Sequence, residues 1–130
     1  MQIKLVSVMV DDQDRAFRFY TTILGFEPCA DIPMGPYRWL TLSSPDGVFG
    51  VELVLEPMSF PPARVYQQAL YEAEIPATSF ITDDIQKEYA RLRSLGVTFM
   101  SEPKNLGPVT VATFDDTCGN LISLAQPNRR

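Results

Sequence analysis

Hydrophobic and polar positions alternate over the first ten residues of the chain and then change to a helical spacing. Val6, Val8 and Val10 recur at every second position, which is typical of a strand with one face in the core. The next apolar residues follow at i, i+3, i+4 and i+7 and predict an amphipathic helix: Ala16, Phe19, Tyr20 and Ile23. We expect Asp12 to cap the start of this helix and Gly25 to follow its end.

Three strands are predicted after this helix, at residues 26–32, 37–42 and 50–56, because β-branched and aromatic residues are separated there by turn signals. A proline-rich segment, 57–62, then leads into a short amphipathic helix. Pro61 and Pro62 are suited to start this helix, and Pro76 ends it.

The same plan recurs in the second half of the chain. A strand is predicted at 77–82, followed by a cap at Asp84 and a helix that Gly96 closes. The apolar face of that helix comprises Ile85, Tyr89, Leu92 and Leu95. Further strands are expected near 97–101, 109–114 and 121–125, with residues 115–120 as the last turn.

The two halves can be aligned with each other. Asp12 and Asp84 lie 72 positions apart, whereas Gly25 and Gly96 lie 71 apart, so the second helix is one residue shorter. Glu52 aligns with Ser123, again 71 positions apart. We therefore predict an α+β fold in which two tandem βαβββ units form a curved mixed sheet around a cleft, with the helices on the outer face. The predicted single domain spans 1–130, with unit one at 1–57, the linker and connecting helix at 58–75, and unit two at 76–127.

Composition restricts the classes of partner. With 130 residues and 45% apolar content, the chain suits one soluble domain. A net charge of −5 argues against nucleic acid, and no apolar run is long enough to span a membrane. The first residues lack the pattern of a signal peptide. Cys29 and Cys118 form no CxxC pair and are expected to be free thiols in a reducing cytoplasm.

Strand alternation also predicts which side chains face away from the helices, toward the cleft. These side chains are small, mixed and partly polar, which suits a ligand pocket better than a packed core. We expect the pocket to be formed by Leu5, Ser7, Trp39, Glu52, Ala77, Ser79, Phe114 and Ser123. For Trp39 and Phe114, a place in the core or in a dimer interface is the alternative.

Two groups of residues give the chain a resemblance to a known family. These are Val10-x-Asp12 with Ala16, Phe19-Tyr20 and Leu24-Gly25-Phe26, and Phe114-Asp115-Asp116-x-x-Gly119-Asn120-Leu121. Together they resemble the vicinal oxygen chelate superfamily, which includes glyoxalases, extradiol dioxygenases, fosfomycin-resistance transferases and bleomycin-binding proteins. The resemblance implies the paired βαβββ fold and a homodimer. It does not define an activity, because the family hosts several.

Metal-dependent members of that family carry a His on the first strand and a Glu on the last strand of each unit. The resemblance places these four positions at Leu5, Glu52, Ala77 and Ser123. The chain has no histidine, and only Glu52 retains a carboxylate. Because a transition metal needs three or four convergent ligands, we expect no metal and no other cofactor.

Three hypotheses for function follow. The first is a metal-free protein that binds a small organic molecule, as bleomycin-binding members do. The second is a glyoxalase-like lyase or isomerase, not a dioxygenase, with Glu52 as general base. The third is a non-catalytic scaffold, with Glu52 merely satisfied by donors such as Ser7, Ser79 or Ser123. The pairs Asp83-Asp84 and Asp115-Asp116 are interpreted as cap and turn residues, and Cys118 has no histidine to activate it.

Overall fold

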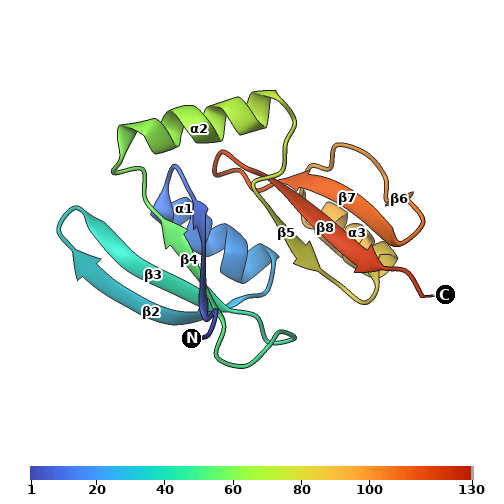
Figure 1. Ribbon diagram of the computed structural model, residues 1–130, viewed down its shortest axis with the longest axis horizontal. Coiled ribbons are helices and arrows are strands. Elements are labelled where there is room, and N and C mark those ends of the chain that lie inside the picture. Colours follow the sequence, from blue (N-terminus) through green and yellow to red (C-terminus); the bar gives the residue numbers. More distant parts are fainter. Residues whose placement is uncertain (130) are drawn as a thin grey trace. The chain divides into compact units, whose positions relative to one another are not determined.

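The computed structural model describes residues 1–129, so Arg130 of the predicted domain lies outside the described range. The chain divides into two compact units, of which the first is Met1–Tyr66 and the second begins at Gln67. Each unit contains one four-stranded mixed sheet built on the same βαβββ plan (Figure 1). The α+β class and the two-unit plan are thereby confirmed.

Sheet 1 belongs to the first unit and has the strand order β1-β4-β3-β2. Strand β1 runs parallel to β4, and the other neighbours are antiparallel. The elements of this unit are β1 (Leu5–Met9), α1 (Gln13–Arg18), the π-helical turn η1 (Phe19–Ile23), β2 (Glu27–Met34), β3 (Tyr37–Ser43) and β4 (Glu52–Glu56). Helix α2 (Pro61–Glu72) follows and starts at the predicted proline pair.

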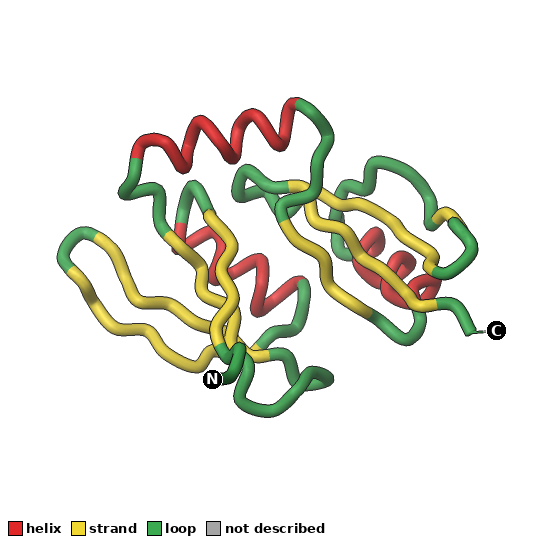
Figure 2. Tube along the Cα trace, in the orientation of Figure 1, coloured by secondary structure: helices red, strands yellow, loops and turns green. Residues whose placement is uncertain are grey.

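Sheet 2 belongs to the second unit and has the equivalent order β5-β8-β7-β6. Here too the first strand is parallel to the last, and the remaining pairs are antiparallel. The elements are β5 (Thr78–Ile81), α3 (Ile85–Ser94), β6 (Lys104–Asn105), β7 (Val109–Asp115) and β8 (Leu121–Pro127). In Figure 2, the strands of both sheets are yellow and the helices are red.

The helix boundaries follow the predicted local signals. The side chain of Asp12 accepts a hydrogen bond from the Arg15 amide at 3.0 Å, and Asp84 accepts one from the Lys87 amide at 3.1 Å. Gly25 and Gly96 have positive φ angles of 87° and 89° at the ends of the two helices. Both N-caps and both C-terminal glycines are therefore confirmed.

The first helix accommodates its one extra residue as a π-helical turn. The amide of Leu24 donates to the carbonyl of Phe19, an i to i+5 bond of 3.1 Å that an α-helix lacks. One inserted residue in an α-helix produces this wider turn. The insertion thus leaves both the cap and the terminal glycine in place.

One face of each sheet forms the core of its unit. In unit 1, α1 packs against this face, whose buried side chains include Val8, Leu40, Leu42, Leu53 and Leu55. In unit 2, α3 packs in the same way over Ala112, Phe114, Ile122 and Leu124. Each sheet also has a second face, directed away from its helix, which we call the opposite face.

The predicted strand at 97–101 is wrong. Only a single bridge, between Phe99 and Phe114, occurs there, and regular pairing begins later with Lys104 opposite Val111. Between these two pairings, this segment is two residues longer than the matching stretch of β7, so it bulges. Pro103 lies in the bulge and has no amide hydrogen to offer a ladder.

Two further sequence expectations concern thiols and membranes. Cys29 is exposed, Cys118 is buried, and both are free, as predicted. Across residues 1–129, no helix combines the length and the apolar character needed to cross a bilayer.

Candidate functional site

The strand register places four predicted site residues on the opposite face of sheet 1. Leu5 pairs with Glu52, and Ser7 pairs with Val54 on the parallel β1–β4 ladder. Val54 also pairs with Thr41 of β3, two residues from Trp39. Because side chains alternate along each strand, Leu5, Ser7, Trp39 and Glu52 share this face.

Glu52 is held on this face by a buried threonine. The hydroxyl of Thr41 donates to Glu52 Oε1 at 2.5 Å, and the oxygen of this hydroxyl accepts from the Ala30 amide at 3.1 Å. Thr41 is fully buried, whereas Glu52 is partly exposed. The expected serine donors are therefore replaced by Thr41, a residue that our sequence analysis missed; Ser7 donates instead to Glu56, at 3.3 Å.

The same face of sheet 1 also carries large apolar side chains that are exposed. Leu5 is 51% exposed, Ile32 54% and Met34 59%, and Trp39 is partly exposed. Ile32 pairs with Trp39, so the two side chains are neighbours on the opposite face. The face therefore combines an aromatic ring, aliphatic surface and two hydrogen-bonded carboxylates, those of Glu52 and Glu56.

The opposite face of sheet 2 carries Ser79 and Ser123, which pair with each other across the β5–β8 ladder. Ala77 precedes β5, and its amide donates to the Leu121 carbonyl at 2.9 Å. Phe114 does not belong to this group. It pairs with Ile122, is 1% exposed, and its ring lies 5.6 Å from that of Phe99 on the α3 side. The structure therefore places Phe114 in the core.

The strand pairing shifts the alignment of the two halves by two residues on their last strands. The Val10 amide bonds to the Glu56 carbonyl, and the Thr82 amide bonds to that of Ala125. If Val10 corresponds to Thr82, then Glu56 corresponds to Ala125, and Glu52 corresponds to Leu121 rather than to Ser123. A shift of two keeps every side chain on its predicted face, because the strand period is two.

The metal centre implied by the family resemblance does not fit these residues. Leu5 and Ala77 have no ligating atom, Ser123 offers a neutral hydroxyl, and Glu52 already accepts from Thr41. Divalent transition metals require several convergent N, O or S ligands. Among residues 1–129, no group of three His, Cys, Asp or Glu side chains is placed to hold a metal ion.

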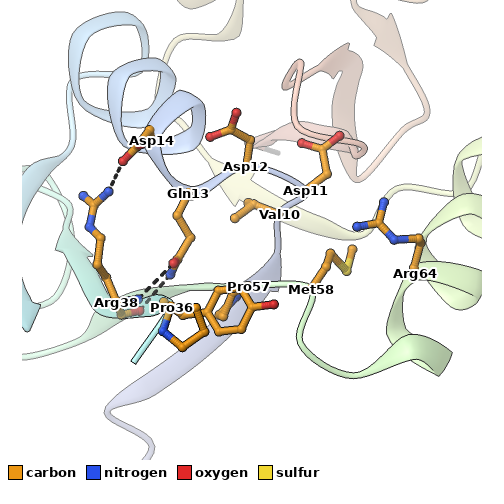
Figure 3. A pocket seen from close by; sticks show the side chains of 11 residues that line it. Val10, Asp11, Asp12, Gln13, Asp14, Pro36, Arg38, Pro57, Met58 and Arg64 are labelled. Atoms are coloured by element: carbon orange, nitrogen blue, oxygen red, sulfur yellow. Dashed lines mark hydrogen bonds and ion pairs between the residues drawn. The ribbon is translucent and has the colours of Figure 1, made fainter. Parts of the chain in front are cut away.

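A separate pocket of about 310 Å³ opens at the end of sheet 1 where β1 and β4 both finish (Figure 3). The carboxylates of Asp11 and Asp12 lie on one side of it, and the Arg64 guanidinium approaches from α2. The Arg15 amide donates to Asp12 and is the main cause that lowers the pKa of this carboxyl. No residue of the predicted site lines this pocket.

Gln13 and Arg38 form the rigid wall of this pocket. The side-chain amide of Gln13 donates to the backbone carbonyls of Arg38 and Leu55 at 2.8 and 2.9 Å. Its oxygen accepts from the backbone amide of Arg38 at 3.0 Å. The Arg38 guanidinium forms ion pairs with Asp31 and Asp14, and the hydrogen bonds to Asp31 are the main cause that raises its pKa. The guanidinium of Arg38 is therefore paired with carboxylates of the protein itself.

Helix α2 adds a tyrosine that our sequence analysis also missed. The hydroxyl of Tyr71 donates to Oδ2 of Asp115 at 2.5 Å, and this bond raises the pKa of the phenol. Gln67, one turn earlier, is buried and donates to the Cys118 carbonyl and to Asn120 Oδ1. The only sequence signal for these contacts was the i, i+4 spacing of Gln67 and Tyr71, which places both side chains on one side of the helix.

A second hollow in unit 2, of about 490 Å³, lies between α3 and the bulged segment. The Arg93 guanidinium lies 5.6 Å from the centre of the Tyr89 ring and donates to its hydroxyl. The walls of this hollow are formed by α3 and the segment that follows α3, and no predicted site residue lines the hollow.

Comparison with known proteins identifies relatives over nearly the whole chain. Residues 2–124 match the family model described as Glyoxalase/Bleomycin resistance protein/Dioxygenase superfamily. The protein YurT of Bacillus subtilis (strain 168) is 53% identical over 126 residues, which cover 97% of this chain and 99% of that protein.

Solved structures agree with this match. The crystal structure of UcmS2 has a TM-score of 0.82 at 34% identity and covers 96% of this chain and 97% of its own. TnmS3, an antibiotic binding protein from Streptomyces sp. CB03234, has a TM-score of 0.75 at 32% identity and covers 98% of this chain and 97% of its own.

Proposed function

The chain belongs to the Glyoxalase/Bleomycin resistance protein/Dioxygenase superfamily, and on this premise we propose that it binds a small organic molecule without a metal ion. One observation carries the proposal: the opposite face of sheet 1 carries the partly exposed Trp39, exposed aliphatic side chains and the oriented carboxylate of Glu52. Ligand sites typically combine such apolar surface with a few placed polar groups.

The chemistry of this face favours a ligand with a flat apolar part. Trp39 offers a ring for stacking, and its exposed partner Ile32 extends the apolar surface beside it. Glu52 offers one oxygen to a donor or a cationic group, since Thr41 engages the other. The similarity to TnmS3, which is described as an antibiotic binding protein, supports a binding role over a structural one.

We further propose that the protein acts as a homodimer in the cytoplasm. The exposed apolar residues of β1 and β2 would be covered by a second copy, a ligand, or both. The free, exposed thiol of Cys29 suits a reducing compartment. Sedimentation equilibrium tests the dimer: a monomer at micromolar concentration would contradict it.

Trp39 is the only tryptophan of the chain, so its fluorescence reports directly on this face. Metal-free bleomycin and proflavine, a planar aromatic cation, would be titrated into the protein with EDTA present. We expect saturable quenching and recovery of the probe unchanged. If neither probe perturbs Trp39 at millimolar concentration, the binding proposal fails.

The variant Glu52→Gln tests the role of the carboxylate, with Asp46→Asn as its control, since Asp46 is exposed and lies in the loop between β3 and β4. Binding by Glu52→Gln that is weaker but still saturable supports sequestration. Chemical conversion of a probe by the wild type, lost in Glu52→Gln with folding intact, would support the lyase or isomerase hypothesis instead.

A further inference from the structure

The pocket at the end of sheet 1 lies where the parallel strands β1 and β4 both finish (Figure 3). The segments that follow these two strands, residues 10–14 and 57–58, supply most of its lining. Loops held at the end of a rigid sheet are common places for binding residues. Every lining residue belongs to the first unit, so the pocket is complete within that unit.

Charges of opposite sign line this pocket and are not paired with each other. The Asp11 carboxylate and the Arg64 guanidinium are both exposed, and in the described part of the chain neither forms an ion pair or a side-chain hydrogen bond. By contrast, the Arg38 guanidinium is paired with Asp14 and Asp31. Arg64 is therefore the guanidinium of this lining that is available to a bound anionic group, and Asp11 is available to a cationic group.

The backbone on both sides of Asp11 is held in place. Before it, the Val10 amide donates to the Glu56 carbonyl at 2.9 Å. After it, the Asp12 side chain accepts from the Arg15 amide at 3.0 Å and so fixes the start of α1. The acidic side of the pocket is therefore preorganised, which lowers the entropy that a ligand would lose on binding.

Apolar contact is available in the same pocket from Pro36, Tyr37, Pro57 and Met58. Sites for small molecules usually combine such surface with a few placed polar groups. The volume of about 310 Å³ lies at the small end of the range of roughly 300–1,000 Å³ found for ligand pockets. We therefore expect a small ligand with an apolar body.

We propose that this pocket binds a small organic zwitterion, such as an α-amino acid, with its ammonium group on Asp11 and its carboxylate on Arg64. Both contacts would be charge-assisted hydrogen bonds, which are stronger than neutral ones. A ligand with a single charge would leave one side of the pocket unpaired. The inference goes beyond the proposed function, because this pocket contains none of the residues assigned to the ligand on the opposite face of sheet 1.

Probes that share one skeleton separate the two contacts. L-phenylalanine carries both charges, phenethylamine lacks the carboxylate, and 3-phenylpropanoate lacks the ammonium group. We expect L-phenylalanine to bind with the highest affinity and to shift the amide NMR signals of residues 10–14 and Met58. Trp39 fluorescence reports on the opposite face and should not change.

Two variants should lose affinity in a crossed pattern. Asp11→Asn should weaken the binding of L-phenylalanine and phenethylamine about three- to fivefold and leave 3-phenylpropanoate unchanged. Arg64→Gln should weaken the binding of L-phenylalanine and 3-phenylpropanoate by a similar factor and leave phenethylamine unchanged. Raising the NaCl concentration should reduce the preference for L-phenylalanine, since the contacts lie near solvent.

Matched controls come from exposed charges of the first unit that do not line the pocket. These are Asp46→Asn and Lys4→Gln, and neither should change binding. Circular dichroism verifies the folding of all variants. The inference is overturned if L-phenylalanine causes no shifts at tens of millimolar, if it binds no better than its two analogues, or if both pocket variants weaken all probes alike. The bleomycin and proflavine titrations test the proposed function separately, so either idea can fail while the other stands.

Discussion

The hydroxyl of Thr41, which is fully buried, donates to the carboxylate of Glu52 at 2.5 Å. The Thr41 hydroxyl oxygen also accepts from the Ala30 amide, so the Thr41 side chain links three strands of sheet 1. Glu52 is thereby oriented by a partner that is itself immobile.

Replacing Thr41 with Val keeps the shape but removes both hydrogen bonds. We expect a loss of about 1–3 kcal/mol in the free energy of unfolding, because the Ala30 amide and the Glu52 carboxylate lose their partner. Urea denaturation measures the change. The exposed Thr98, substituted in the same way, is the control; equal effects at both sites would contradict the assigned role.

Gln13 should matter more to stability than the ion pair beside it. Gln13→Leu removes three hydrogen bonds that join α1 to β3 and β4, with an expected cost of about 2–3 kcal/mol. Asp14→Asn removes a pair in which the Asp14 side chain is 74% exposed, and should cost less than about 1 kcal/mol. Thermal denaturation of both variants compares them directly, and the reverse order would refute this account.

Gly119 is required by its backbone angle and by its neighbour. Its φ is +96°, and a Cβ there would lie 2.6 Å from Oε1 of the buried Gln67. Gly119→Ala should therefore lower the free energy of unfolding by more than about 1 kcal/mol. Gly107→Ala is the matched control, since Gly107 has a φ of +100° with open space around it. Similar losses in both variants would mean that contact with Gln67 adds nothing.

The cap at Asp12 should make part of the stability depend on acid. The Arg15 amide holds the pKa of Asp12 below its ordinary 3.8 in the folded state. A depressed folded pKa stabilises the protein above the unfolded pKa, and this stabilisation is lost as pH falls through the folded pKa. Asp12→Ser keeps a capping oxygen that does not titrate. We expect the stability difference between wild type and Asp12→Ser to shift against the wild type between pH 5 and about pH 2. A difference that does not change with pH would contradict it.

Local signals in the sequence were sufficient for the helix ends. Asp12 and Asp84 cap their helices through bonds to amides three residues ahead, and Gly25 and Gly96 adopt positive φ angles where L side chains are strained. These features depend on residues within one turn of each other. The extra residue of the first helix was also visible in the alignment of the two halves, although its form as a π-helical turn was not.

Predictions that needed pairing across the sheets were less complete. Phe114 was expected beside the pocket, but the short turn between β7 and β8 pairs it with Ile122 and so turns it into the core. The strand at 97–101 failed because a bulge with Pro103 interrupts its pairing with β7. Both outcomes depend on register, which turn length and packing set together.

By itself, the sequence determined the two βαβββ units and their helix caps, because hydrophobic period and local hydrogen bonding depend on neighbouring residues. It also determined that Leu5, Ala77 and Ser123 lack the ligands that a metal would need, because this depends on side-chain chemistry alone. Only the tertiary structure decided which polar groups meet. Thr41 reaches Glu52 across eleven residues, and Tyr71 reaches Asp115 across forty-four. Such pairs form when strands and helices from distant segments dock, and no local pattern encodes the distance between their side chains.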